Sequence, residues 1–232
     1  MNMAADYGSQ KFWDERYAKA SGSSQVSHFE WFPSKGQDVM IEAIKRTGVG
    51  SSDRILDVGC GSSRLIWDLC DEGYTRVIGI DFSPVVIKKL QAEREQCAGA
   101  KEQTLHLFHM DAAALAFSDA SIALVVDKGL LDSVLAVHDR RELWKRSGKK
   151  EAQDPFLKRA AREAEEKGRK VLVELRRILK SDGVYLVVSY EEPTYRMPFL
   201  RQASAEGEQL WREVSCETYD EDNRWFLYTC KA

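Results

Sequence analysis

The sequence predicts an α/β protein: a three-layer α/β/α domain with a mostly parallel sheet and a C-terminal antiparallel hairpin. Five short apolar runs alternate with segments of helical spacing, which is typical of successive βα units. The last part of the chain instead alternates polar and apolar side chains, as antiparallel strands do. The runs expected to form strands are 54–58, 77–80, 105–109, 122–126 and 184–189, followed by 209–219 and 224–231 with a turn at 220–223.

The length and composition indicate one globular domain. With 232 residues the chain can bury a full core, so we expect residues 1–232 to form a single domain. Hydrophobic residues make up 44%, and no apolar run approaches the roughly 18 residues of a membrane span. The N-terminus lacks the basic-then-apolar order of a signal peptide, and the five cysteines are scattered without a C-x-x-C pair. We therefore expect a cytoplasmic protein with reduced thiols and without a disulfide frame or metal site.

The charge is unevenly distributed along the chain. The net charge is −3, yet residues 138–180 hold 15 Lys and Arg against 8 Asp and Glu. We interpret this stretch as a basic helical insertion. It is either a docking surface for an acidic partner or a solvated helix of mixed charge.

A glycine-rich turn after the first strand predicts a nucleoside-binding site. Gly59 and Gly61 let a ligand lie against the main chain, beside the N–H groups that begin a helix. Asp81 follows Gly61 by 20 residues, about the offset at which a second strand presents an acid to ribose hydroxyls. Arg64 replaces the third glycine of a dinucleotide motif, and Asp57 would repel phosphate but attract a cation. The pattern favours a cationic nucleoside such as S-adenosylmethionine over NAD.

The N-terminal region, about 9–47, is expected to form a helical and aromatic cap. Trp13 and Tyr17 are four residues apart, so their rings meet on one helix face. They either pack on the core or cover a sulfonium ligand through cation–π contact. The cap is expected to comprise a helix at 9–20, a polar link at 21–27, the aromatic segment 28–33 as a lid or pocket wall, and a helix at 37–46 that stops at Gly48.

The remaining elements follow from local signals. Ser83 and Pro84 are typical of a helix start, and Asp111 could accept a hydrogen bond from an adenine amino group. His106 and His109 have no ligand-like partners, so we expect them at a surface or edge. Helices are expected at 64–71, 84 to about Cys97, and 155–179 with an interruption at Gly168; loops or turns are expected at 149–153, 182–183 and 190–193.

Three segments resemble those of a known enzyme family. They are 12–17 (FWDERY), 29–32 (FEWF) and 127–132 (DKGLLD), the last close to the signature D/E-K-G-T-L-D with Leu130 in place of threonine. Over essentially its whole length the chain is similar to Class I S-adenosylmethionine-dependent methyltransferases. It looks most like the eukaryotic enzymes that methylate lysine of translation elongation factor 1-alpha. The resemblance implies a Rossmann-like methyltransferase fold, with S-adenosylmethionine as cofactor and S-adenosylhomocysteine as product.

The resemblance also implies roles for individual residues. Signature residues 127–132 would be needed for activity, with Asp127, Lys128, Gly129 and Asp132 as the catalytic set. The residues expected to bind the cofactor are Trp13, Tyr17 and Phe29 as pocket walls, Asp57, Gly59 and Gly61 at the glycine turn, Asp81 and Phe82 at the ribose and adenine, Met110 and Asp111 at the base, and Lys128.

Methyl transfer from a sulfonium is an in-line displacement, so the protein mainly positions the nucleophile and excludes water. A lysine acceptor must first lose its proton, because an ammonium has no lone pair. Asp127, Asp132 and Glu191 are candidates near the transfer point, with Trp31 and Tyr190 as walls of the acceptor channel.

Other functions compete with this one. A small-molecule methyltransferase and a non-catalytic scaffold that binds the cofactor both fit the same fold. The segment after the fourth strand is not N/D-P-P-Y, which counts against DNA bases and glutamine as acceptors. The basic stretch lacks interleaved aromatic residues, which counts against RNA. We expect a protein substrate, translation elongation factor 1-alpha, and a monomer without a membrane or nucleic-acid partner.

Overall fold

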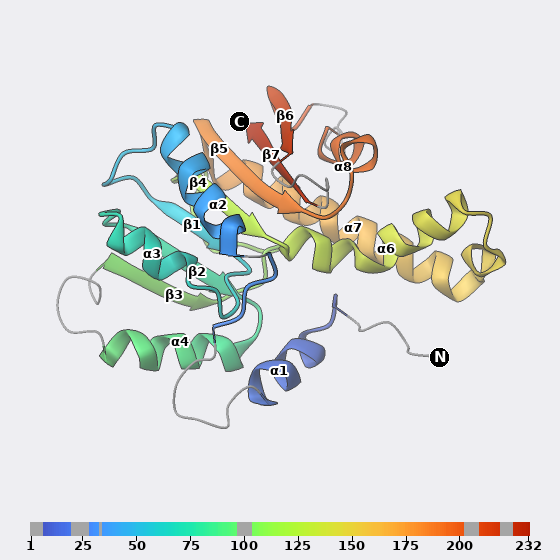
Figure 1. Cartoon of the computed structure of the whole chain (residues 1–232), viewed down its shortest axis with the longest axis horizontal. Coiled ribbons are helices and arrows are strands. Elements are labelled where there is room, and N and C mark those ends of the chain that lie inside the picture. The colour runs from blue at the N-terminus through green and yellow to red at the C-terminus, as the bar shows by residue number, and fades with distance from the viewer. Residues whose placement is uncertain (1–6, 20–27, 33, 97–103, 202–208, 219–224) are drawn as a thin grey trace.

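The computed structural model describes residues 7–19, 28–32, 34–96, 104–201, 209–218 and 225–232. Seven strands form one sheet in the order β3-β2-β1-β4-β5-β7-β6 (Figure 1). Strands β1 to β5 pair in parallel, whereas β7 is antiparallel to both β5 and β6. The strands are β1 Ile55–Val58, β2 Val77–Asp81, β3 Leu105–His109, β4 Ile122–Lys128, β5 Leu179–Ser189, β6 Glu213–Thr218 and β7 Phe226–Lys231.

Helices cover both faces of this sheet and create two hydrophobic cores. Successive strand residues such as Ile55 and Leu56 belong to different cores, because side chains of a strand point alternately to its two faces. The helices of one face are α2 Ser34–Arg46, α3 Leu65–Asp71 and α4 Pro84–Gln96, and those of the other are α6 Leu130–Arg146, α7 Pro155–Ile178 and α8 Pro193–Leu200. The predicted three-layer α/β/α fold with a C-terminal hairpin is therefore confirmed.

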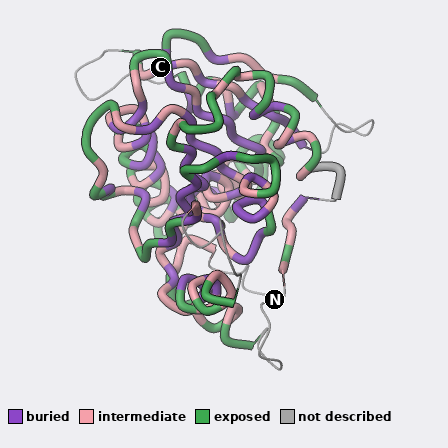
Figure 2. The backbone as a smooth tube through the Cα atoms, turned by 90° about the vertical axis from the view of Figure 1, so that its left-hand side faces the viewer, coloured by how far each residue is buried: buried purple, intermediate pink, exposed green. Residues whose placement is uncertain are grey.

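Buried residues gather in the interior of the molecule (Figure 2). All four residues of β1 and all five of β2 are buried, which explains their continuous hydrophobic sequence. The edge strand β3 instead exposes His106 and His109, as expected from the sequence. No helix in the described part of the chain is long and apolar enough to cross a lipid bilayer.

The expected interruption of the long helix at Gly168 is wrong. Helix α7 continues through this residue, which is buried where α7 packs on neighbouring helices. A Cβ added at Gly168 would lie 2.8 Å from Leu135 Cδ2 on α6 and 3.0 Å from Phe199 Cζ on α8. Glycine is needed here for close packing and does not end the helix.

Other differences concern boundaries. Residues 182–183 belong to β5, where the register shifts against β4, and do not form a separate turn. The expected loop at 149–153 contains a short 3₁₀ helix, η1 Lys150–Gln153, and helix α8 was not anticipated. Strand β4 continues two residues further than expected and includes Asp127 and Lys128. The link at 21–27, Cys97 and the turn at 220–223 lie outside the described residues.

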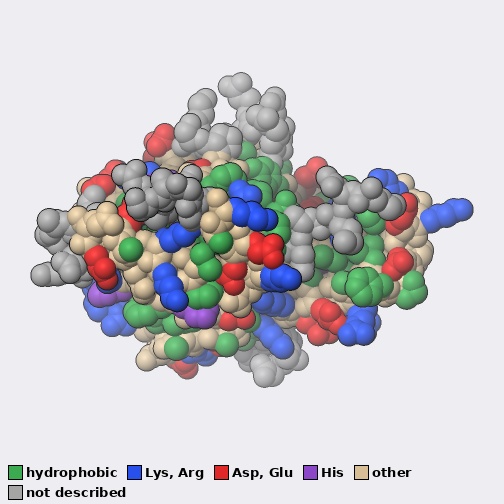
Figure 3. Space-filling model, turned by 90° about the horizontal axis from the view of Figure 1, so that it is seen from below, with side chains coloured by type: hydrophobic (Ala, Val, Ile, Leu, Met, Phe, Trp, Pro, Cys, Tyr) green, Lys and Arg blue, Asp and Glu red, His purple; other side chains and the backbone are tan. Residues whose placement is uncertain are grey.

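The basic stretch, residues 138–180, includes the second half of α6, η1 and all of α7, which together form a helical hairpin. This hairpin extends away from the sheet (Figure 1). On α7, Arg159 pairs with Glu163 and Arg169 with Glu165, each across one helical turn. Basic and acidic side chains are also interspersed on the face that Figure 3 shows. The pairs favour the interpretation of this stretch as a solvated helix of mixed charge.

Candidate functional site

A cavity lies at the carboxyl ends of β1, β2 and β4, where open α/β sheets bind their ligands. The glycine turn, the strand ends and the N-terminal aromatic segments all line it. The predicted site residues brought together here are Trp13, Tyr17, Phe29, Asp57, Gly59, Gly61, Asp81, Phe82, Met110, Asp111, Lys128 and Gly129. Asp127 and Asp132 lie outside this cavity.

The glycine turn has a backbone that other residues adopt poorly. Gly59 and Gly61 have φ values of +67° and +53°, in the left-handed region. A Cβ added at Gly59 would lie 2.9 Å from Leu130 Cβ, and one added at Gly61 would lie 2.9 Å from Tyr17 Oη. The turn therefore brings β1, the start of α6 and the N-terminal helix α1 (Gln10–Lys19) into close contact.

Asp57 is a fully buried acid at the end of β1. Its Oδ2 atom has no hydrogen-bond partner among the described residues. The pKa of Asp57 is raised to about 8, mainly by burial and also by the nearby carboxylates of Asp127, Glu30 and Asp81, while Lys128 opposes the shift. A buried carboxylate oxygen without a donor is a site for a cationic hydrogen-bonding group.

Asp81, at the end of β2, faces the glycine turn. Its carboxylate accepts hydrogen bonds from Gly61 N at 3.0 Å and from Ser83 N at 2.8 Å. Burial raises its pKa to about 6, and these two bonds oppose the shift. A carboxylate has about four acceptor positions, so two remain for hydroxyl groups of a ligand.

The far end of the cavity is built from two loops and α7. Phe82, Met110 and Asp111 line it, and Lys167 reaches it from α7. The Lys167 ammonium lies 5.4 Å from the centre of the Phe82 ring and 3.9 Å from Asp111 Oδ2. Lys167 could not be placed here from sequence, because it is 56 residues from Asp111 and lies among other charged residues of a helix.

Aromatic side chains cover the cavity from the N-terminal side. The Trp13 and Tyr17 rings stack at 5.7 Å, as their four-residue spacing predicted, and Trp31 packs edge-on against Trp13 at 5.9 Å. The Arg16 guanidinium lies 4.4 Å from the centre of the Phe29 ring. Tyr7 also lines the cavity and accepts a hydrogen bond at its carbonyl from Trp13 Nε1 at 2.7 Å.

Lys128 connects this cover to the sheet. Its largely buried ammonium donates to Glu30 Oε2 and to Ser63 Oγ, both at 2.6 Å. Glu30 also accepts from the backbone N–H of Arg64 at 2.8 Å, just before α3 begins. Glu30 was missed from the sequence, where the only signal was an acid between aromatic residues.

Asp127 serves the turn between β4 and α6. Its carboxylate accepts from Leu130 N at 2.7 Å, Leu131 N at 3.1 Å and Tyr185 Oη at 2.9 Å. Burial raises the pKa of Asp127 to about 7, and these hydrogen bonds oppose the shift. Asp127 thus satisfies the first N–H groups of α6 and holds Gly129, in left-handed conformation, at the edge of the cavity.

A second cavity adjoins the first and shares Tyr7, Trp31, Gly129 and Ser133 with it. Its other walls include Phe32 and Tyr190, whose rings stack at 4.6 Å. The Tyr190 hydroxyl donates to the Trp31 carbonyl at 2.7 Å. Three carboxylates, those of Asp132, Asp139 and Glu191, also border this cavity. It combines aromatic walls with negative charge.

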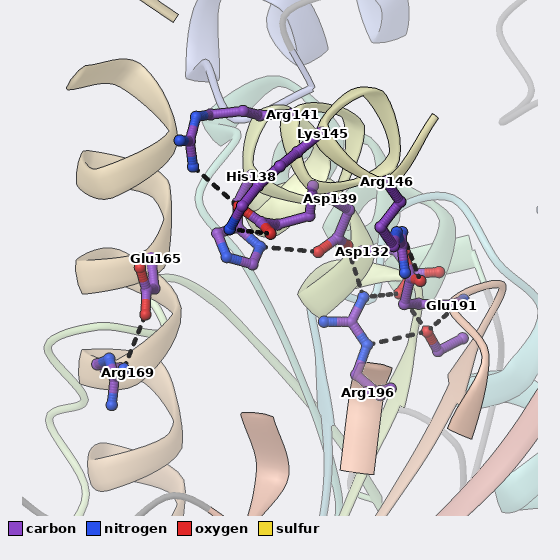
Figure 4. A network of polar contacts seen from close by, with 12 residues as sticks. Asp132, His138, Asp139, Arg141, Lys145, Arg146, Glu165, Arg169, Glu191 and Arg196 are labelled. Atoms are coloured by element: carbon purple, nitrogen blue, oxygen red, sulfur yellow. Dashed lines mark hydrogen bonds and ion pairs between the residues drawn. The ribbon is translucent and has the colours of Figure 1, made fainter. Parts of the chain in front are cut away.

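A buried arginine organises these acids (Figure 4). Arg196 of α8 is 1% exposed and donates to Asp132 Oδ1 at 3.1 Å and Asp139 Oδ2 at 2.7 Å. Its Nε also donates to Ser189 Oγ at 3.2 Å. Asp139 and Arg196 were not among the predicted site residues, because they are 57 residues apart and lie on helices that the sequence did not bring together.

A family model described as a methyltransferase domain matches residues 50–226, from the start of the sheet to its last strand. The chain belongs to this methyltransferase family. EEF1A lysine methyltransferase 4 from Mus musculus is 34% identical over 130 residues, 56% of this chain and 47% of that protein. The human eEF1A lysine and N-terminal methyltransferase is 26% identical over 202 residues, 87% of this chain and 24% of that protein.

A third relative differs in its named substrate. The human mitochondrial citrate synthase-lysine N-methyltransferase is 29% identical over 209 residues, 83% of this chain and 74% of that protein. This methyltransferase spans about half of the mouse relative and about a quarter of the human elongation-factor enzyme.

Solved structures agree on the fold. The PH0226 protein from Pyrococcus horikoshii OT3 matches with a TM-score of 0.58 and 16% identity, covering 93% of this chain and 98% of that one. The N-methyltransferase NodS from Bradyrhizobium japonicum WM9, solved with S-adenosylhomocysteine, also has a TM-score of 0.58, with 11% identity and coverage of 94% and 97%.

The cofactor of this methyltransferase is S-adenosylmethionine, as predicted. The cavity fits it, because the buried Oδ2 of Asp57 lacks a donor that the cofactor's ammonium group can supply. Asp81 retains acceptor positions for hydroxyls, and the aromatic cover suits a sulfonium. Within the described ranges, no cluster of three or more His, Cys, Asp or Glu could hold a metal ion.

Proposed function

We propose that this methyltransferase methylates the side-chain amine of a lysine in a protein, and that translation elongation factor 1-alpha is its substrate. The second cavity is the main support, since its aromatic walls and three carboxylates suit a cationic side chain. This cavity meets the first at Gly129 and Ser133, so a side chain in one can reach a ligand in the other. Relatives named for elongation-factor and citrate-synthase lysines point to the same acceptor class.

The proposed roles in the first cavity follow the geometry. Bound S-adenosylmethionine supplies an electrophilic methyl group on a sulfonium, which leaves as a neutral thioether. Asp57 would pair with the ammonium of the cofactor, and Asp81 would accept from ribose hydroxyls. The adenine would lie beside Phe82, Met110 and Asp111. The cover formed by Trp13, Tyr17 and Phe29 would exclude water from the reacting centre.

The proposed roles of the signature residues differ from one another. Lys128 would hold the cover closed through Glu30, and Gly129 would let the acceptor pass close to the main chain. Asp127 would act through the backbone that it holds, because its oxygens face Leu130, Leu131 and Tyr185. Together with Arg196, Asp132 would help to shape the second cavity, hereafter the acceptor cavity.

The substrate proposal places the enzyme in the cytosol, where elongation factor 1-alpha works, whereas citrate synthase would place it in mitochondria. The test is transfer of labelled methyl from S-adenosylmethionine to each purified protein, with Asp57→Asn as a variant that should not hold the cofactor. Lysine labelling of elongation factor 1-alpha, located by mass spectrometry, supports the proposal. Label on citrate synthase alone corrects the substrate. The same assay on a lysate tests the class of acceptor, and label found there only in a protease-resistant or small-molecule fraction contradicts a protein acceptor.

A further inference from the structure

The three carboxylates of the acceptor cavity differ in how fully their oxygens are used. Asp132 accepts from Ser189 Oγ at 2.5 Å, Tyr190 N at 2.8 Å and Arg196 at 3.1 Å. Asp139 accepts from Arg196 at 2.7 Å and lies 3.0 Å from His138 Nδ1. Both carboxylates are held by short contacts within the protein.

Glu191 is held differently. Its backbone is fixed, because its N–H donates to Ser189 Oγ at 3.1 Å and its carbonyl accepts from Tyr228 Oη at 2.6 Å. Its carboxylate, 18% exposed, has a single ion pair in the described part of the chain, with Arg146 Nη2 at 3.6 Å. The Arg146 guanidinium also lies 3.4 Å from the centre of the Tyr195 ring. The backbone of Glu191 is therefore positioned, while its oxygens keep capacity for another donor.

Charged groups from two helices face this carboxylate (Figure 4). Burial raises the pKa of Glu191, and the acids Asp139 and Asp132 of α6 raise it further. Arg196 of α8 and Arg146 of α6 oppose that shift. A carboxylate with a raised pKa is a better proton acceptor near neutral pH than an ordinary exposed one.

We propose that Glu191 is the catalytic base that takes the proton from the acceptor ammonium in the acceptor cavity. This inference rests on the proposed lysine methylation and deepens it. The N–H bond of the ammonium breaks, its electron pair stays on nitrogen as the lone pair, and the proton forms an O–H bond on Glu191. The neutral amine is then the nucleophile for the methyl group, and Glu191 returns its proton to water after transfer. Arg146 is the counter-ion that the incoming ammonium displaces.

The test compares Glu191→Gln with Glu192→Gln, a neighbouring exposed position that does not line the cavity. Each variant is assayed from pH 6 to 10 with purified elongation factor 1-alpha, or with citrate synthase if that protein takes the label. We expect Glu191→Gln to lower kcat by about 10²–10⁴-fold near neutral pH, the usual contribution of a general base. Its activity should then rise with pH toward the lysine pKa of about 10.4, because solvent must remove the proton. Glu192→Gln should keep the wild-type rate and profile.

A second readout does not depend on turnover. Binding of the protein substrate to enzyme loaded with S-adenosylhomocysteine is measured by calorimetry in two buffers of different ionisation enthalpy. The two proteins should differ in the number of protons exchanged on binding, because a cation beside Glu191 shifts the ionisation of its carboxyl and glutamine has no carboxyl to titrate. S-adenosylhomocysteine should raise the melting temperature of both proteins equally.

An unchanged pH profile in Glu191→Gln, or equal proton exchange in the two proteins, overturns the assignment of Glu191. A wild-type enzyme that labels no protein lysine overturns the proposed function instead. The two failures are thus distinguished by whether the wild type itself transfers label.

Discussion

Arg196 Nη2 lies 2.7 Å from Asp139 Oδ2, and this contact joins α8 to α6 beneath the acceptor cavity. The same nitrogen donates to Asp132 Oδ1 at 3.1 Å, so one buried cation neutralises part of two carboxylates. Asp132 in turn accepts from the N–H of Tyr190, a wall of the cavity. The shape of the acceptor cavity therefore depends on a residue that does not line it.

Arg196→Met should destabilise the protein strongly. Removing one partner of a buried ion pair leaves carboxylates uncompensated, which costs about 3–5 kcal/mol of unfolding free energy. Arg196→Lys keeps a positive charge but cannot contact both carboxylates in the same geometry. It should therefore lose less unfolding free energy than Arg196→Met does. Denaturant unfolding measures both. The double variant Arg196→Met/Asp139→Asn should recover part of the loss, and equal stability of the single and double variants would contradict this coupling.

The loss of unfolding free energy in Arg196→Met should change with pH in a defined direction. Burial raises the pKa of Asp132 and the Arg196 guanidinium opposes that rise, so removing the guanidinium raises the folded-state pKa of Asp132 further above its unfolded value. Stability from such groups is present at low pH and is lost as pH rises through the folded pKa. The deficit of Arg196→Met relative to wild type should therefore be larger at pH 8 than at pH 5. A deficit that is equal at both pH values would show that lost packing, not charge, dominates.

Asp57→Asn should abolish cofactor binding and flatten the pH dependence of stability. The pKa of Asp57 in the folded protein is about 8, above its ordinary value, so ligand-free wild type loses stability as pH rises from about 4 to 8. Asparagine removes that titration, so Asp57→Asn should melt higher than wild type at pH 8 without ligand. Each kcal/mol shifts the melting temperature by about 2–4 °C at this chain length.

The stabilisation of the protein by ligand should change with pH in the opposite direction to the stability of the ligand-free protein. A cationic ligand pairs with the ionised acid, so stabilisation of wild type by S-adenosylhomocysteine should increase between pH 6 and pH 8. At 100 times the Kd this stabilisation is about 2.7 kcal/mol. Asp57→Asn should show almost none, whereas Asp182→Asn, an exposed control on β5, should respond like wild type. A normal shift in Asp57→Asn would exclude the acid from the ligand site.

Glu30→Gln should loosen the aromatic cover. The substitution keeps an oxygen for the N–H of Arg64 but removes the charge that faces Lys128 at 2.6 Å. Hydrogen bonds to charged groups contribute about 1.5–3 kcal/mol, so the affinity for S-adenosylhomocysteine should fall about 10- to 100-fold. Stopped-flow fluorescence should locate the effect in faster dissociation. Glu15→Gln, on the exposed side of α1, is the control, and equal affinities would disprove the role of the contact.

The sequence predicted the elements whose residue types depend on their own burial and backbone conformation. The strands could be found because burial on both faces requires continuous apolar runs, as in Ile55–Val58. The glycine turn could be found because Gly59 and Gly61 need positive φ. The predicted acceptor residues Asp132 and Glu191 and the predicted walls Trp31 and Tyr190 do line the acceptor cavity. Asp139 and Arg196 could not be found, because they meet only after α6 and α8 dock on the sheet. Helix α8 was missed for a related reason, since Pro193 and Pro198 resemble breakers and its packing overrides that signal.

Gly168 shows how a local rule fails in a packed helix. Glycine in a helix interior costs about 1 kcal/mol relative to alanine, so its presence in α7 was interpreted as a break. Gly168 lies against Leu135 and Phe199, and the close packing that it permits offsets the cost of a glycine in the helix. The absent Cβ lets three helices approach one another beside the acceptor cavity. The tertiary contact decides the residue type, and no short window of sequence contains it.

Gly168→Val should therefore destabilise the protein although glycine is a poor helix former. A Cβ at 2.8 Å from Leu135 Cδ2 and 3.0 Å from Phe199 Cζ forces these side chains or their helices to shift, and such overpacking costs about 1–3 kcal/mol. Lys170→Val, exposed on the same helix, places a valine in α7 without overpacking and should stay within about 0.5–1 kcal/mol of wild type. Urea denaturation of both variants measures the difference. Equal stability of Gly168→Val and Lys170→Val would contradict this prediction, because it would show that the three helices accommodate the added side chain without strain.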